Sequence, residues 1–227
     1  MRISSVNVGR ERPIQNAKPS GKTGIFKEAT TEPVRVTSFG LAGDHISDTK
    51  NHGGVDQAVY VFGVPDYDWW SDALGKKLAS GTFGENLTVS GFESGEAFIG
   101  DRLWIGAVVL EVTAPRIPCV TLAARMQDPV FLKRFRRAER PGVYCRVIRE
   151  GEVRAGDSVT LERYDGEKVS AVEVFRDFFD PDFSEATLRR HLAVPIAVRA
   201  RAVKERQLGE LVEQRRVMEA GRPAKAV

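Results

Sequence analysis

The sequence predicts a mainly β fold with helices: a closed or nearly closed β-barrel with helices over its mouth, followed by a small three-helix domain. Short β-branched segments separated by glycine and proline fill the first two-thirds of the 227 residues, a pattern typical of barrels and sandwiches. After about Gly166, apolar residues recur at three- to four-residue spacing, which is typical of helices. The predicted boundaries are 1–165 for the barrel, 166–212 for the three-helix domain and 213–227 for a tail.

Nine segments of the barrel region predict strands, and tight turns between consecutive segments favour antiparallel pairing. The predicted strands are Ile3–Val8, Gly24–Phe26, Val34–Phe39, Val59–Phe62, Asn86–Val89, Arg102–Ile105, Val108–Thr113, Val143–Ile148 and Ser158–Arg163. Helical patterns interrupt them at Pro65–Leu78, Cys119–Met126 and Pro129–Arg136.

Residues 168–179, 184–194 and 195–219 carry the helical spacing of the C-terminal region. Ser184 is expected to cap one of these helices and Pro195 to lie in the first turn of the next, because serine and proline are favoured there. The segment DPDF, residues 180–183, is expected to turn between two helices.

The composition excludes several classes of protein. Hydrophobic residues make up 42% and charged residues 29%, an ordinary globular balance. No apolar run approaches the roughly 20 residues that span a bilayer, and MRISSVNVGRERP lacks the apolar core of a secretory signal. We therefore expect a cytoplasmic protein without a membrane partner.

The charge pattern argues against nucleic acid as a partner. The net charge is only +3, and basic and acidic residues are interleaved almost throughout, whereas nucleic-acid binders concentrate positive charge in one patch. The densest basic cluster, FLKRFRRAERPG (residues 131–142), is interpreted as a solvated helix face. Its cations are Lys133, Arg134, Arg136, Arg137 and Arg140.

Cys119 is the first candidate for chemistry. With Pro118 at the first helical position, the thiol would lie in the first turn of a helix, where free backbone N–H groups favour an anion. Arg116 adds positive charge, and both effects lower the pKa of a thiol, whose thiolate is the nucleophile and the metal ligand. A small buried hydrophobe is the alternative. Cys145, inside GVYCRVI, is interpreted as core filler, and two cysteines exclude a four-thiolate metal site.

Two loops carry further polar candidates. Residues 43–62 hold two of the three histidines and a glycine pair, and such glycines permit a loop to wrap a phosphate or a planar ligand. A zinc site at His45 and His52 is an alternative, although their spacing is wider than in common zinc motifs; a plain turn-rich loop is another. Glu85 and Asn86 are placed to anchor the polar edge of a heterocycle, or simply to form a turn. The segment SGKTG fails the P-loop pattern, because Asn16 stands where glycine is required.

These segments together resemble a known family. Their order and spacing are similar to those of the MOSC-domain proteins, and more narrowly to the bacterial branch related to 6-hydroxylaminopurine-resistance proteins, which carries a C-terminal three-helix domain. The segments are KPSGKTGIFK, LAGDHISDTKNHGGVDQAVYVF, FGENLTVSG and IGDRLWIGAVVLEVTAPRIPC. The resemblance implies a MOSC-type β-barrel over residues 1–165 and the branch's three-helix domain over residues 166–212.

The resemblance also implies a site that binds a molybdenum cofactor of the molybdopterin type. In that family a cysteine matching Cys119 is the protein ligand to molybdenum, so Cys119 would be both metal ligand and catalytic residue. Cofactor-binding residues implied in the same way are Lys22, His52, Gly53, Asp56, Gln57, Gly84, Glu85, Asn86, Arg116 and Tyr144. Among them, Lys22 and Arg116 would meet the phosphate and dithiolene end, where positive charge is needed.

The implied activity is the reduction of N-hydroxylated compounds, such as hydroxylamino-purines, to amines, a detoxification of base analogues. The chain has no flavin fingerprint and too few cysteines for an iron–sulfur relay, so an external electron-transfer protein is the expected partner. A homodimer is compatible with the sequence. The alternative function is a carrier that binds molybdenum cofactor or its sulfur without redox turnover.

Overall fold

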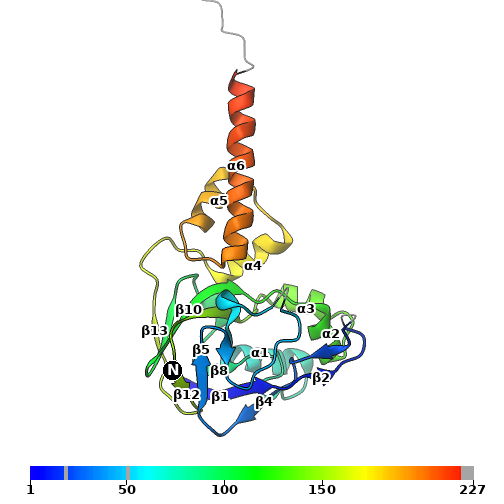
Figure 1. Cartoon of the computed structure of the whole chain (residues 1–227). Coiled ribbons are helices and arrows are strands. Elements are labelled where there is room, and N and C mark those ends of the chain that lie inside the picture. Colours follow the sequence, from blue (N-terminus) through cyan, green and yellow to red (C-terminus); the bar gives the residue numbers. More distant parts are fainter. Residues whose placement is uncertain (18–19, 50–51, 221–227) are drawn as a thin grey trace, which may run out of the picture.

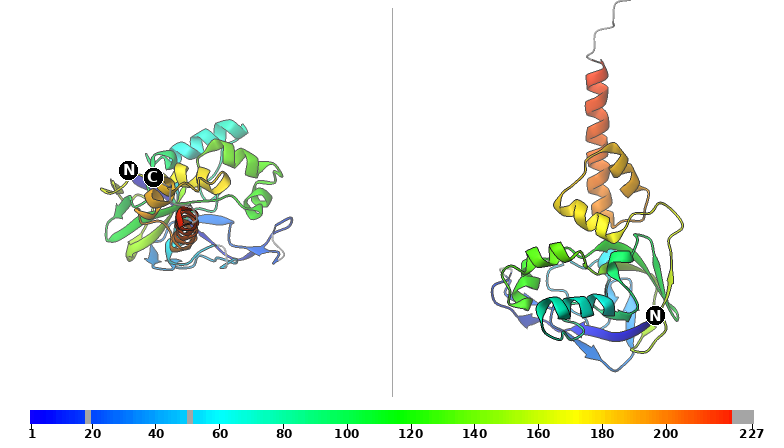
Figure 2. Two further views of the ribbon diagram at one scale, coloured as in Figure 1. Left: turned by 90° about the horizontal axis from the view of Figure 1, so that it is seen from above. Right: turned by 180° about the vertical axis from the view of Figure 1, so that it is seen from behind.

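The computed structural model describes residues 1–17, 20–49 and 52–220. The polypeptide forms a strongly curved sheet flanked by helices, and a separate group of three helices stands on one end of it (Figure 1). The long last helix projects away from the rest of the molecule, both in Figure 1 and when seen from behind (Figure 2, right).

One eight-stranded sheet dominates the fold, and its strand order is β13-β9-β10-β11-β7-β8-β1-β4. Its strands are β1 (Arg2–Gly9), β4 (Lys27–Thr30), β7 (Val59–Gly63), β8 (Leu87–Ser90), β9 (Arg102–Ile105), β10 (Val108–Pro115), β11 (Val143–Arg149) and β13 (Thr160–Glu162). All neighbours pair antiparallel except β7 and β8, which pair in parallel. The parallel pair is possible because helix α1 (Val64–Leu74) lies between these strands in the chain and provides the crossover that such pairing requires.

The strand ladder does not close into a complete barrel, because β13 and β4 form its two ends. The sheet nevertheless curls so far that its first strand meets the segment just before β13. Arg2 forms an isolated bridge with Ser158, and the Val159 N–H donates to the Met1 carbonyl over 2.9 Å. The mainly β class expected from the sequence is confirmed, with a curled sheet in place of a closed ring.

Several of the shortest strands were not predicted, because segments of two to four residues show little alternation, although Val34–Thr37 lies within the predicted strand Val34–Phe39. A three-stranded sheet joins β12 (Gly151–Val153), β5 (Val34–Thr37) and β6 (Gly40–Leu41), and a hairpin joins β2 (Arg12–Pro13) and β3 (Lys22–Thr23). The strand predicted at Gly24–Phe26 was wrong: it is a bend between β3 and β4. A Cβ at Gly24 would lie 1.8 Å from the His45 carbonyl oxygen, so a crossing chain occupies that position.

Three helices cover one side of the curved sheet: α1 (Val64–Leu74), α2 (Val120–Met126) and α3 (Phe131–Ala138). Short 3-10 turns occupy η1 (Val55–Gln57) and η2 (Ser94–Glu96). Aromatic side chains fill the space between sheet and helices, including Trp70, Phe83, Phe131 and Phe135, all at most 1% exposed. The interior of the curved sheet holds a second cluster that is mostly aliphatic.

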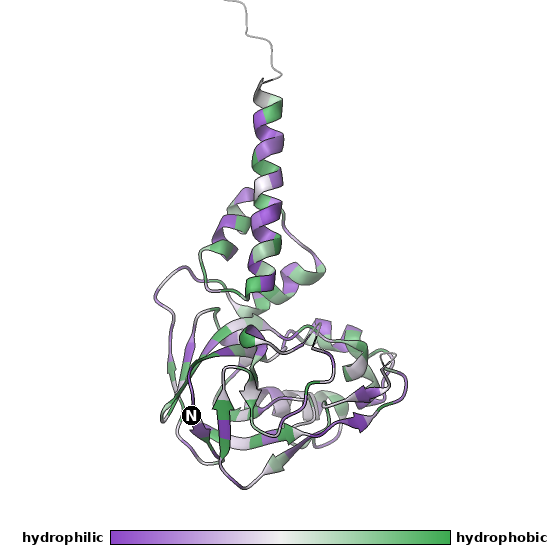
Figure 3. Cartoon of the chain, viewed as in Figure 1, coloured by the Kyte–Doolittle hydropathy of each residue, from purple (hydrophilic) through white to green (hydrophobic). Residues whose placement is uncertain are grey.

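The C-terminal group comprises α4 (Ala171–Phe179), α5 (Glu185–Leu192) and α6 (Val198–Ala220). Ser184 caps α5 as predicted, because its side chain accepts a hydrogen bond from the Thr187 N–H over 3.3 Å. Pro195 does not begin α6, which starts three residues later, where Asp56 accepts a hydrogen bond from the Val198 N–H over 2.6 Å. Polar and apolar residues are mixed along the projecting part of α6 (Figure 3).

The domain boundaries at 165 and 212 stay predictions. Val169 and Ala171, just beyond the first boundary, pack into the same cluster as the sheet interior. Helix α6 continues through residues 213–220, part of the predicted tail, and residues 221–227 lie outside the described residues. Over the residues that the structure describes, no helix combines the length with the apolar character needed to cross a membrane.

Candidate functional site

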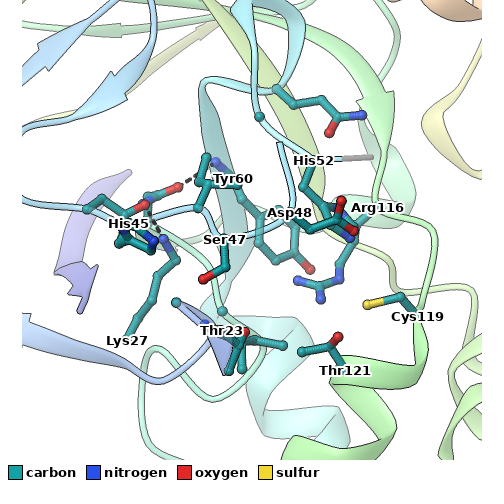
Figure 4. Close-up of a pocket in the computed structure, with 18 of the residues that line it drawn as sticks. Thr23, Lys27, His45, Ser47, Asp48, His52, Tyr60, Arg116, Cys119 and Thr121 are labelled. Atoms are coloured by element: carbon teal, nitrogen blue, oxygen red, sulfur yellow. Dashed lines mark hydrogen bonds and ion pairs between the residues drawn. The ribbon is translucent and has the colours of Figure 1, made fainter. Parts of the chain in front are cut away.

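A pocket of about 710 Å³, its open mouth included, lies where the β3–β4 segment, the loop before η1 and the start of α2 meet (Figure 4). Nine of the eleven residues predicted for the site line this pocket. They are Lys22, His52, Gly53, Gln57, Gly84, Asn86, Arg116, Cys119 and Tyr144. Five separate segments of the sequence thus converge on one cavity.

Cys119 is the N-cap residue of α2, and not part of its first turn as predicted. Its backbone is extended, with φ −127° and ψ 165°, the conformation that N-cap residues adopt. The Cys119 carbonyl accepts hydrogen bonds from the N–H groups of Leu122 (2.9 Å) and Ala123 (3.2 Å). Pro118 therefore precedes the helix, and the thiol sits at the entrance of α2, facing the pocket.

The environment of Cys119 favours the thiolate. Burial raises the pKa of this thiol, but the hydrogen bond with His52 and the positive charge of Arg116 lower it by more, to about 6. The Cys119 sulfur and the Arg116 guanidinium point toward one another across the pocket wall (Figure 4). A thiol with this pKa is largely ionised at pH 7, as a nucleophile or a metal ligand must be.

Arg116 is a buried cation with one edge unused. Only 4% of the residue is exposed. One guanidinium nitrogen donates to the Phe83 carbonyl over 2.6 Å, and the group lies 5.0 Å from the centre of the Tyr60 ring. Its Nε has no hydrogen-bond partner among the described residues. Because burying an unpaired polar group costs free energy, this arrangement suits an anionic or hydrogen-bonding ligand.

Lys27, Asp44 and Tyr60 also line the pocket, although the sequence did not single them out. The Lys27 ammonium pairs with Asp44, which also accepts a hydrogen bond from Asn86 over 2.9 Å. Burial lowers the pKa of Lys27, and Asp44 offsets part of that shift. No motif marks these residues, because only folding brings a strand lysine to a loop aspartate; the charge of Lys27 within a short strand was the only available signal.

Gly84 and Gly53 form parts of the wall that a side chain would block. Gly84 has φ +78°, and a Cβ there would lie 2.8 Å from Ile25. Gly53 has φ +75°, and its Cβ would lie 2.9 Å from Ile46. Both positions combine left-handed backbone with close packing, so glycine is needed for the shape of the pocket.

Asp56 does not line the pocket, contrary to the prediction. Its carboxylate pairs with Arg146 over 2.9 Å and caps α6 at Val198. Arg146 also donates to the Ile196 carbonyl over 3.3 Å. Asp56 therefore connects the segment that carries Gln57 to the start of α6. The sequence signal was misread because side chains of neighbouring residues in the 3-10 turn point in different directions.

Glu85 is the second predicted residue that lies outside the pocket. It is 0% exposed, and its Oε1 accepts hydrogen bonds from the Tyr67 hydroxyl (2.6 Å), the Gly81 N–H (2.6 Å) and the Thr88 hydroxyl (2.8 Å). Burial raises the pKa of this carboxyl, although these donors lower it in part. Glu85 fixes the turn behind Gly84 from within the protein.

The zinc alternative finds no support. Within the described ranges, no group of three or more His, Cys, Asp or Glu side chains is arranged to hold a metal ion, and His45 pairs with Glu11 over 3.1 Å. Cys145 is fully buried in β11, where burial raises the pKa of its thiol. A metal in the pocket would thus have Cys119 as its thiolate ligand from this chain.

Comparisons with known proteins identify the family of the chain. The MOSC domain matches residues 48–160. The chain is 33% identical to the uncharacterized protein YflK of Bacillus subtilis over 70% of this chain and 72% of that protein, and 28% identical to protein YiiM of Escherichia coli over 69% and 70%. It is also 33% identical, over 67% of its length, to a protein of Gibberella moniliformis named Reductase, of which it covers 28%.

The fold has a close counterpart among solved structures. The crystal structure of YiiM from Geobacillus stearothermophilus superposes with a TM-score of 0.75, covering 91% of this chain and 98% of that one at 24% identity. The chain therefore belongs to the family of MOSC-domain proteins, which are associated with molybdenum cofactor, and it is a YiiM-like member of that family.

Proposed function

We propose that this protein is a molybdenum-cofactor-dependent oxidoreductase that reduces N-hydroxylated compounds, such as hydroxylamino-purines, to amines. The observation that carries the proposal is a pocket thiol with its pKa lowered to about 6, held beside a buried arginine. A relative named Reductase, of which this chain covers 28%, supports the redox class. The residues of the pocket supply what such a cofactor requires.

The donor set fits a molybdopterin. The Cys119 thiolate offers molybdenum a soft, anionic sulfur ligand. Arg116, Lys27 and Lys22 offer positive charge for the dithiolene and phosphate groups. The Gln57 Oε1 is buried without a partner among the described residues, and it can accept a hydrogen bond from a pterin N–H.

The reaction consumes two electrons and two protons: R–NHOH gives R–NH₂ and water. The bound cofactor would supply the two-electron exchange that cleaves the N–O bond. The protein would hold the ligand thiolate at the α2 N-cap and balance its charge with Arg116. The Lys27 Nζ, paired with Asp44 in the pocket wall, holds a proton beside the site, and its lowered pKa makes that proton easier to release.

The electrons require a separate donor protein. Cys119 and Cys145 are the only cysteines, so this chain cannot bind an iron–sulfur cluster with four of its own thiolates. A one-electron carrier delivering two successive electrons would complete the cycle.

The first test is the molybdenum content of the protein purified from a host that makes the cofactor. Wild type and Cys145→Ala should each carry about one molybdenum per chain, whereas Cys119→Ala should lose it, because the thiolate ligand is gone. Elemental analysis measures the ratio, and unfolding curves confirm that both variants fold. Undiminished molybdenum in Cys119→Ala would contradict the ligand assignment.

The second test is turnover with a small chemical reductant. The molybdenum-loaded protein, reduced methyl viologen and 6-hydroxylaminopurine should give adenine. If the loaded protein binds molybdenum but forms no adenine, the carrier function replaces the reductase.

A further inference from the structure

A basic groove lies between α3 and α4, where the three-helix group meets the rest of the protein. It measures about 1160 Å³ including its open side, and α4 lies directly above α3 when the molecule is seen from behind (Figure 2). Its cations are Lys133, Arg136, Arg137 and Arg176. We call this surface the α3–α4 groove. It contains most of the basic cluster that the sequence suggested was merely a solvated face.

The free charge in the groove comes from three exposed residues. Two further arginines of the basic cluster are neutralised within the protein: Arg134 pairs with Asp128, and Arg140 pairs with both Asp66 and Glu93. Arg176 pairs with Glu139. Lys133, Arg136 and Arg137 form no ion pair among the described residues, and they are exposed. Asp180 and Glu139 are the carboxylates that line the groove, so its four cations leave a net charge of +2 (four minus two).

The floor of the groove is aromatic. Phe175 and Phe179 line it, and the Arg136 guanidinium lies 4.7 Å from the centre of the Phe179 ring. Phe178, the next residue to Phe179 on α4, is 61% exposed. Aromatic rings with arginine are the combination enriched at protein–protein interfaces, and a solvated helix face would not expose them together.

Packed rings connect the groove to the pocket without a break. The Phe175 ring lies 6.2 Å from Phe135, and Phe135 lies 6.2 Å from Phe83. Phe83 stacks on Phe62 at 4.5 Å, and Phe62 lies 6.2 Å from Tyr60, which lines the pocket. The groove thus lies behind the pocket, across one continuous aromatic cluster that also contacts Cys119.

We propose that the α3–α4 groove is the docking surface for a small acidic one-electron carrier protein. The inference rests on the proposed function, since it assigns the donor that this function needs. Each docked carrier would lose one electron to the cofactor, and two dockings reduce one R–NHOH to R–NH₂ and water with two protons from solvent. The unbalanced cations select a partner whose docking face carries carboxylates, and the exposed Phe178, next to Phe179 on α4, offers an apolar contact beside the groove.

The test compares two double variants of the molybdenum-loaded protein with equal changes in net charge. Lys133→Glu/Arg137→Glu reverses the charge of two groove residues. It leaves the contact of Arg136 with the Phe179 ring and the ion pair of Arg176 with Glu139 in place. Arg206→Glu/Arg216→Glu reverses two exposed cations on α6, which is the competing surface. A plant-type [2Fe–2S] ferredoxin and an FMN flavodoxin, both acidic, serve as probes, and surface plasmon resonance measures their association at several salt concentrations.

At least one carrier should bind the wild type, and its association rate constant should fall as the salt concentration rises, because charge complementarity acts mainly on association. The groove variant should bind about tenfold or more slowly at low salt, while the α6 variant should bind like wild type. Molybdenum content and turnover with methyl viologen should be equal in all three proteins. Turnover driven by the reduced carrier should fall only in the groove variant.

Three results would overturn the docking assignment: neither carrier binds, the α6 variant is the one that loses binding, or a short DNA duplex binds through the groove while both carriers fail. Failure of the proposed function is a different result. In that case the carrier binds through the groove, yet methyl viologen supports no adenine formation.

Discussion

The two cysteines of this protein occupy regions of opposite character. Cys119 stands at the N-cap of α2, at the edge of the aromatic cluster, and faces a pocket that holds buried cations. Cys145 lies inside β11, between Val59 and Val112 of the neighbouring strands, in the aliphatic cluster. Charged neighbours lower the pKa of the first thiol to about 6, and burial raises that of the second.

The difference teaches that the neighbours of a thiol, more than its burial, decide whether it is activated or silenced. Burial acts on both sulfurs in the same direction, toward the neutral form. Only Cys119 has an arginine and a histidine close enough to reverse that effect. The strand interior supplies a carboxylate instead, since Glu111 adds to the upward shift of Cys145.

The largest expected effect is the difference in thiol reactivity. In the metal-free native protein at pH 7, iodoacetamide should modify Cys119 more than about 10⁴-fold faster than Cys145, because the thiolate is the reacting species. The rate at Cys119 should be half-maximal near pH 6 and fall about tenfold for each pH unit below it. Mass spectrometry of peptides measures both sites. Comparable modification rates of the two cysteines in folded protein would contradict the predicted difference in thiol reactivity.

Local patterns were sufficient for the long strands but not for the contacts between distant segments. Strands such as β10 and β11 carry runs of β-branched residues, which mark a pleated, buried surface wherever they occur. The start of α6 could not be foreseen in the same way. It depends on Asp56, more than a hundred residues earlier, whose carboxylate fixes where the helix begins.

The site was predictable to the extent that its residues have unusual local chemistry. Cys119 follows a proline, and Gly84 occupies a turn that excludes side chains, so both carry a signal in the sequence. Lys27 and Asp44 carry no motif, because their pairing exists only after β4 and the loop come together. Glu85 was adjacent to the right residues but points into the protein, a distinction that depends on the path of the backbone.

A smaller effect tests which neighbour activates Cys119. His52→Ala removes the hydrogen bond that is the largest of the influences lowering the pKa of Cys119. The pKa should rise by about one unit, so alkylation at pH 5 should slow about tenfold. His45→Ala is the matched control, because His45 lines the same pocket but pairs with Glu11, and its pH profile should equal that of wild type. An unchanged profile in His52→Ala would leave Arg116 as the activating group.

The smallest expected effect is on stability, where Cys145 should matter more than Cys119. Cys145→Ala removes a sulfur from a fully buried position, so it should lower the free energy of unfolding by about 1 kcal/mol through lost contacts and the cavity left behind. Cys119→Ala should change it by less than about 0.5 kcal/mol in the metal-free protein, because the partly exposed sulfur borders the open pocket. Urea unfolding measures both. Equal losses would mean that Cys119 also serves as packing for α2, and the separation between a reactive thiol and a structural thiol would no longer hold.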